Sequence, residues 1–81
     1  MTYLIFTEKK DNLHRMVDTY FEAFTILDAK GFWQGVAEDS AVILVVSDEP
    51  ERVKNLCHVI KVVNKQEAVL LVSLNNEDEL I

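Results

Sequence analysis

The residues of this chain that are typical metal ligands or redox groups are few. The candidates are Cys57, His58 and His14, and no CxxC or HxxxH spacing joins them. Cys57 and His58 are neighbours on an expected helix, where side chains one residue apart point about 100° away from each other. We therefore predict no metal site, with Cys57 as a small core residue and both histidines in solvent.

Nucleophilic and acid–base chemistry also lacks a motif. No serine stands in a GxSxG frame or has an obvious histidine partner: Ser40, Ser47 and Ser73. Adjacent carboxylates such as Glu38-Asp39 are typical of solvated turns and caps, not of acid–base pairs. The segment 31–35 (GFWQG) has the wrong spacing for a phosphate-binding loop. The sequence therefore favours a non-catalytic protein without a cofactor.

Segment 28–40 (DAKGFWQGVAEDS) is the best candidate for a recognition surface. It holds both glycines of the chain around an aromatic pair, so we predict a long hairpin connection; the alternative is that the preceding strand runs on into that pair. Bulky residues in such a connection either anchor a ligand or pack across the sheet or a subunit boundary. We predict binding at this 31–40 loop or an adjacent intersubunit cleft, with aromatic anchors and polar orienting groups: Phe32, Trp33, Gln34, Glu38, Ser40, Gln66 and Glu67.

The elements that must position these residues alternate between strand and helix. Apolar runs predict strands over 2–7 (TYLIFT), within 21–27, over 41–46 (AVILVV) and over 67–74 (EAVLLVSL). Apolar residues at helical spacing predict helices over about 8–20 and from 47–51 to 64–65. The expected helix faces are Leu13, Met16, Val17 and Tyr20, and Val53, Leu56, Cys57, Ile60 and Val63. Thr7 and Asp48 are the expected N-caps.

The β-α-β-β-α-β order predicts an α+β, ferredoxin-like fold, in which a four-stranded sheet carries two helices on one face. Strands one and three lie in the centre, with strand four beside one and strand two beside three. We expect a single domain over 1–74 and an acidic C-terminal tail over 75–81. We also expect both helix starts, at Thr7 and Ser47, to share one sheet edge with Gln66-Glu67, where nearby carboxylates cap the helices and repel anions.

Composition and charge narrow the class of partner. The chain of 81 residues is 49% apolar, and it carries 14 acidic against 8 basic residues, a net charge of −6. Nucleic acids and anionic membranes need positive charge, so neither is an expected partner. A single cysteine, no signal peptide and no apolar run of membrane-spanning length predict a cytoplasmic protein.

The strands are apolar on both faces, although two helices cover only one face of such a sheet. Runs 3–6, 42–46 and 69–72 would each leave large apolar side chains in water. An exposed patch of this kind usually marks an interface. We therefore predict a homo-oligomer, a trimer or dimer, packed through the open sheet face; the alternative is that segment 28–40 and the tail cover that face.

The element order, the long connection and several short stretches resemble the PII-like signalling superfamily and small bacterial and phage proteins of that shape. The stretches are 24–27, 31–35, 38–40 and 66–70. The resemblance implies trimers assembled through their sheets, with nucleotides or metal ions bound near subunit clefts. The basic, glycine-rich nucleotide site of PII proteins has no match here, so the resemblance implies a fold and an assembly more than an activity.

Three functions remain open from the sequence. The first is an oligomeric binding or regulatory module that recognises a small ligand or protein. The second is a small dimeric ferredoxin-like enzyme acting on an organic substrate in a cleft over the sheet, for which the available polar groups are Tyr3, His14, Thr25 and Glu67. The third is an acidic, phage-type inhibitor of a host protein, which the charge and size suit.

Overall fold

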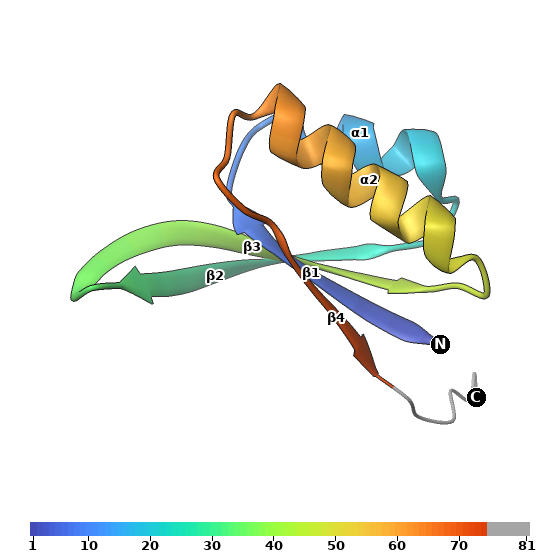
Figure 1. The fold of residues 1–81 in the computed structure, drawn as a ribbon, viewed down its shortest axis with the longest axis horizontal. Helices are drawn as coiled ribbons and strands as arrows, with labels where there is room; N and C mark the ends of the chain where they lie inside the picture. The colour runs from blue at the N-terminus through green and yellow to red at the C-terminus, as the bar shows by residue number, and fades with distance from the viewer. Residues whose placement is uncertain (75–81) are drawn as a thin grey trace.

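The computed structural model describes residues 1–74, which form four strands and two helices in the predicted order (Figure 1). The elements are β1 (Thr2–Glu8), α1 (Leu13–Tyr20), β2 (Thr25–Trp33), β3 (Val36–Val46), α2 (Pro50–Val63) and β4 (Leu70–Leu74). The sheet order is β2-β3-β1-β4, and every neighbouring pair is antiparallel. The predicted ferredoxin-like fold is thus confirmed. The predicted acidic tail, 75–81, lies outside the described residues.

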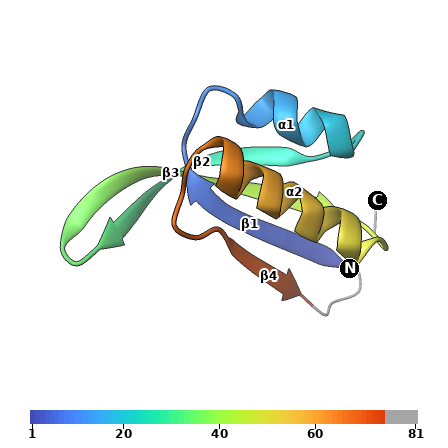
Figure 2. The same cartoon turned by 45° about the horizontal axis from the view of Figure 1, so that its top comes forward.

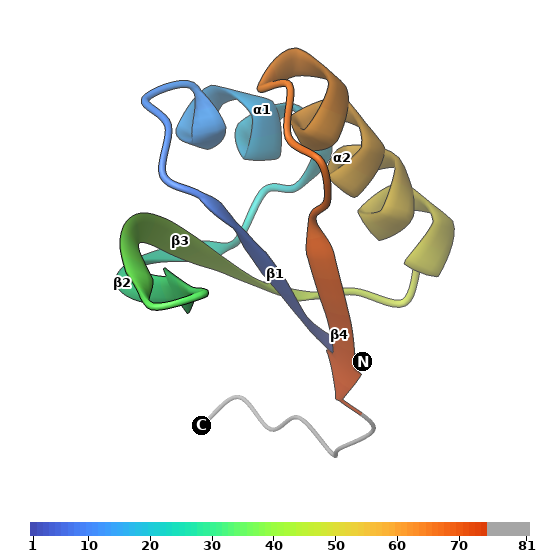
Figure 3. The ribbon, with the colours of Figure 1, turned by 60° about the vertical axis from the view of Figure 1, so that its left-hand side comes forward.

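The core lies between the sheet and the two helices, which both cover the same face (Figure 1, Figure 3). Alternate residues of β1 and β3 point into it, and Ile5, Ile43 and Val45 are completely buried there. The helices contribute Val17, Leu56 and other apolar residues at the predicted spacing. Val63 is a correction: the last residue of α2 is 54% exposed because it lies beyond the covered part of the sheet.

The first helix starts at Leu13 and not at about residue 8 as predicted, whereas the second starts at Pro50, within the predicted segment 47–51. β1 continues through Glu8, which pairs with Ser40, and α1 begins only at Leu13, with Asn12 as its N-cap. α2 begins at Pro50, with Glu49 as N-cap, while the Ser47 side chain accepts a hydrogen bond from the Glu49 backbone N–H at 3.0 Å. The N-caps are thus Asn12 and Glu49 and not the predicted Thr7 and Asp48. Neither Asn12 nor Glu49 makes a side-chain capping hydrogen bond.

Segment 28–40 is a regular hairpin and not a loop. β2 and β3 pair continuously to Trp33 and Val36, joined by a two-residue turn at Gln34 and Gly35. Both turn residues have positive φ, 50° and 80°, as a type I′ turn requires. The paired strands extend past the helices as an arm (Figure 2). The predicted 31–40 loop is therefore wrong, because this segment forms the outer part of the hairpin arm. The alternative, that the strand continues into the aromatic pair, is what the structure shows.

The two helix starts do not share a sheet edge, which corrects the predicted clustering. β1 and β3 are antiparallel, with Thr2 opposite Val46 and Thr7 opposite Ala41. The carboxyl ends of these two strands, from which the chain leads toward α1 and α2, therefore lie at opposite ends of the sheet along the strand direction. Gln66 lies beside Thr7, and thus far from Ser47.

The turn geometry makes a stability prediction. Gly35→Ala should lower the free energy of unfolding by about 1 kcal/mol, because an L side chain at φ near 80° clashes with its own backbone. Gln34→Gly is the matched substitution, and it should be neutral or stabilising because glycine accepts positive φ without strain. Urea unfolding followed by circular dichroism measures both; equal effects of the two substitutions would contradict the turn.

Candidate functional site

A groove of about 770 Å³ lies where the hairpin arm meets the end of β1 and the α2–β4 connection. Six of the seven residues singled out in the sequence border it, and Gln34 does not, because it sits in the turn at the tip of the arm. The complete lining is Phe6, Thr7, Glu8, Ala29, Lys30, Gly31, Phe32, Trp33, Glu38, Ser40, Val42, Lys65, Gln66, Glu67, Ala68 and Leu70.

Small residues hollow the sheet at this groove. Ala29 lies opposite Ser40, and Gly31 lies opposite Glu38, all on the sheet face away from the helices. A Cβ atom placed on Gly31 would lie 2.7 Å from Ser40 Oγ, so the two strands leave no room for a side chain there. Ser40 therefore fills the place that a Gly31 side chain would take, and the glycine that sequence reasoning assigned to a turn allows this close approach of the two strands.

Aromatic and apolar side chains form the walls of the groove. Trp33 is 68% exposed, and it shares the sheet face of Gly31, two residues away on the same strand. Phe6 and Leu70 stand opposite each other on β1 and β4 at the other end. Phe32 is 73% exposed but points to the other face of the arm, so it borders the groove from the outside.

The charged groups of the groove are unevenly paired. Lys30 binds Asp39 across the hairpin, with 2.8 Å between Nζ and Oδ1, and this contact lowers the pKa of the Asp39 carboxyl from its ordinary value. Glu8 lies 3.8 Å from the Lys10 ammonium. Within residues 1–74, Glu38 and Glu67 have neither an ion pair nor a side-chain hydrogen bond, so two carboxylates at the groove are uncompensated.

Gln66 holds the α2–β4 connection against the end of β1. Its Oε1 accepts a hydrogen bond from the Thr7 hydroxyl at 2.9 Å and another from the backbone N–H of Glu8 at 3.3 Å. Its Nε2 is buried and finds no acceptor among the described residues. The amide therefore acts as a clamp on one side of the groove.

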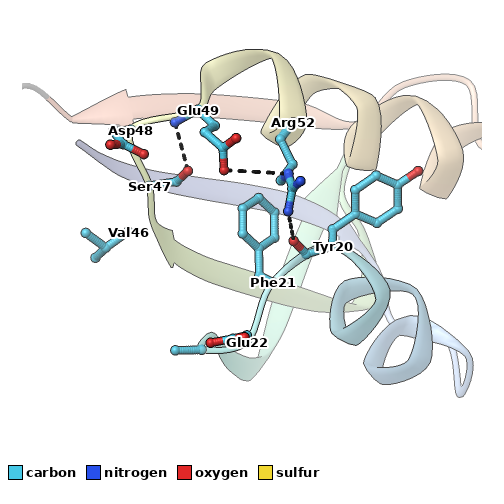
Figure 4. Close-up of a pocket in the computed structure, with 9 residues that line it drawn as sticks. Tyr20, Phe21, Glu22, Val46, Ser47, Asp48, Glu49 and Arg52 are labelled. Carbon is cyan, nitrogen blue, oxygen red and sulfur yellow. Dashed lines mark hydrogen bonds and ion pairs between the residues drawn. The ribbon is translucent and has the colours of Figure 1, made fainter.

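A second hollow, of about 350 Å³, lies at the opposite end of the molecule, between the end of α1 and the start of α2 (Figure 4). Arg52 spans it, donating to the backbone oxygen of Tyr20 at 3.2 Å and lying 3.6 Å from the Glu49 carboxylate. Glu22 and Asp48 also border this hollow. The arginine is already engaged and carboxylates surround it, so an anion gains little there.

The residues weighed for metal or thiol chemistry lie apart. No three His, Cys, Asp or Glu side chains within the described part of the chain gather closely enough to hold a metal ion. His14 is exposed and its ring lies 5.9 Å from that of Phe24. Cys57 packs against the core, and this burial raises the pKa of its thiol to about 11. No helix in residues 1–74 is both long and apolar enough to cross a membrane.

The polar groups considered for an enzyme are also dispersed. Tyr3 is buried under the helices, His14 is on the surface of α1, and Thr25 is an exposed residue near the start of β2. Only Glu67 reaches the groove. The lining residues that the site prediction missed are mainly apolar, such as Phe6 and Leu70; the sequence marked both as surplus apolar strand residues, but only the register shows that they face the arm.

Comparison with solved structures supports the fold. A DUF3240 family protein from Shewanella baltica matches with a TM-score of 0.59 and 15% identity, over 99% of this chain and 96% of that protein. CutA1 from Pyrococcus horikoshii, in a mutated form, matches with a TM-score of 0.56 and 15% identity, over 98% and 88%. The divalent cation tolerance protein Cut A1 from Thermus thermophilus gives 0.55 and 14%, over 96% and 88%.

These likenesses establish a shared ferredoxin-like architecture and nothing finer, since the sequences differ at most positions. No protein-family model and no curated protein matches the chain in sequence. The chain thus belongs, by fold, with small β-α-β-β-α-β proteins that include Cut A1 and the DUF3240 protein.

The clamp makes a second prediction. Gln66→Ala should lower the free energy of unfolding by about 1–2 kcal/mol, because two hydrogen bonds to one amide oxygen are lost. Glu67→Ala, at the neighbouring exposed position, should change it by less than about 0.5 kcal/mol. Chemical denaturation measures both, and an equal cost for the two variants would contradict the clamp.

Cys57 makes a third prediction. Because burial raises the pKa of the thiol from 9.0 to about 11, its thiolate fraction at pH 8 should be about 100-fold below that of the unfolded chain. Alkylation by iodoacetamide, followed by mass spectrometry, should therefore be slow in the folded protein, fast in urea, and faster as pH rises toward 11. Equal rates in the folded and unfolded protein would contradict this environment.

Proposed function

We propose that this chain is a non-catalytic binding module of the cytoplasm that assembles with copies of itself through the open sheet face. A small ligand or a segment of a partner protein then occupies the groove at the hairpin arm. The observation that carries the proposal is a continuous apolar surface on the sheet face opposite the helices.

The register identifies the residues of this face. Leu4 lies opposite both Leu44 and Val72, and Phe6 opposite both Val42 and Leu70. Outside the hairpin arm, five large apolar strand residues on this face are substantially exposed: Phe6 (38%), Leu27 (52%), Val46 (57%), Leu70 (59%) and Leu74 (38%). Apolar side chains that are contiguous across four strands are costly in water, and an interface is their usual purpose. The arm continues the sheet and leaves this face open, which favours a partner over self-coverage by segment 28–40.

The groove and the open face are continuous. Phe6, Val42 and Leu70 belong to both. A second copy seated on the face would therefore border the groove and turn it into an intersubunit cleft, as the sequence prediction allows. The fold shared with Cut A1 and the DUF3240 protein is compatible with this arrangement, and a trimer is the assembly that the PII-like resemblance implies.

The dispersed polar groups count against the alternative of an enzyme. None of Tyr3, His14 and Thr25 lines the groove, so the polar groups considered for catalysis do not converge there. The groove instead combines an aromatic wall, an apolar floor and a few polar groups, which is typical of a recognition site.

Static light scattering at low micromolar concentration tests the assembly. The protein should have two or three times the 9.3 kDa mass of the chain. Leu27→Lys, on the open face, should shift the mass toward the monomer because it places a charge in the interface. Val62→Lys is the matched control, since Val62 is 75% exposed on α2, away from the sheet. A clean wild-type monomer, or equal effects of the two substitutions, would overturn the proposed interface.

A further inference from the structure

We infer that the groove binds the cationic end of a small organic amine, an ammonium group carried on a short alkyl chain. The inference rests on the proposed function, because it names the ligand class of the same groove. Three features carry it: the exposed indole of Trp33, the uncompensated carboxylates, and the apolar floor below them.

Trp33 provides the surface that a cation prefers. Its side chain borders the groove while 68% of it stays open to solvent. The face of an indole ring attracts ammonium groups more strongly than other aromatic side chains do. Gly31, on the same strand face, carries no side chain of its own that could cover the ring.

The charges around the ring have the matching sign. Glu38 lies opposite Gly31 in the register, one pair along the same face from Trp33, and it lines the groove. Glu67 faces the groove from the α2–β4 connection, and both carboxylates lack an ion pair within the described residues. Lys30 is held by Asp39, which leaves Lys65 as the lining lysine without an ion pair in residues 1–74. The net charge of −6 adds a long-range attraction for cations.

The remaining lining residues favour an organic amine over a metal ion as the ligand. Phe6, Val42 and Leu70 offer apolar contacts next to the carboxylates, which an alkyl chain uses and a hydrated metal ion does not. Among the described residues, no three His, Cys, Asp or Glu side chains gather closely enough to hold a metal ion. An anionic ligand would meet the unpaired carboxylates of Glu38 and Glu67, against Lys65 as the lining lysine without an ion pair within residues 1–74.

The single tryptophan of the chain, Trp33, gives a direct readout. Titration with hexylammonium should change its fluorescence in a saturable way, whereas hexanol should bind more weakly and hexanoate not at all. Glu38→Gln keeps the shape and removes the charge, so it should weaken hexylammonium binding by about two- to fivefold. Glu22→Gln makes the same change of net charge at the opposite end of the molecule and should leave the binding unchanged.

The outcomes are separable from those of the assembly test. A response to hexanol or hexanoate equal to that of hexylammonium, the absence of saturation, or equal effects of Glu38→Gln and Glu22→Gln would overturn the inference. A monomeric protein with charge-dependent amine binding keeps the inference and overturns the oligomer. An oligomer without saturable binding does the reverse.

Discussion

The antiparallel pairing of β1 with β3 is the constraint on which the rest of the structure depends. It places Ile5 and Ile43 side by side under the helices, both completely buried, and it fixes which residues face the other way. Because successive side chains of a strand point to opposite faces, each residue that points into the core is followed by a residue on the open face. Two helices of 8 and 14 residues cover only one side of a four-stranded sheet. The chain nevertheless places Leu4, Phe6 and Leu44 on the other, which is the origin of the proposed interface.

The hairpin arm follows from the same pairing. β2 and β3 stay in register beyond the part of the sheet that the helices cover, so both faces of the arm meet solvent (Figure 2). Alternation then sends Phe32 and Trp33 to opposite faces. The arm is held by the backbone ladder, the Lys30–Asp39 contact and a turn whose residues both tolerate positive φ. Trp33 is thus presented by regular structure, which orders it without burying it.

The sequence indicated the element order and the core faces correctly, because long apolar runs and helical spacing are governed by burial. It missed the arm, because 36–40 (VAEDS) is polar and is typical of a loop, and its strand pairing depends on β2 alongside it. It placed the start of the first helix too early for a related reason: Glu8 is held in β1 by pairing with Ser40, which outweighs its preference for a first helical turn. Six site residues nevertheless converge, because the antiparallel β1–β4 pairing brings the start of the α2–β4 connection to the root of the arm. The close approach of Ser40 to Gly31 had no signal in the sequence, since glycine in a polar segment indicates a turn.

The overlap between the open face and the groove has a thermodynamic consequence. If a second copy packs on Phe6 and Leu70 while a ligand touches the same side chains, the two events share surface and cannot be independent. Linkage then requires that the effect of ligand on assembly equals the effect of assembly on ligand affinity. The sign depends on whether the neighbouring copy completes the groove or occupies it. If the neighbouring copy completes the groove, the ligand strengthens the oligomer; if the copy occupies the groove, the ligand dissociates the oligomer. In either case a change in ligand concentration becomes a change in assembly. This behaviour is expected of a regulatory module and not of a rigid scaffold.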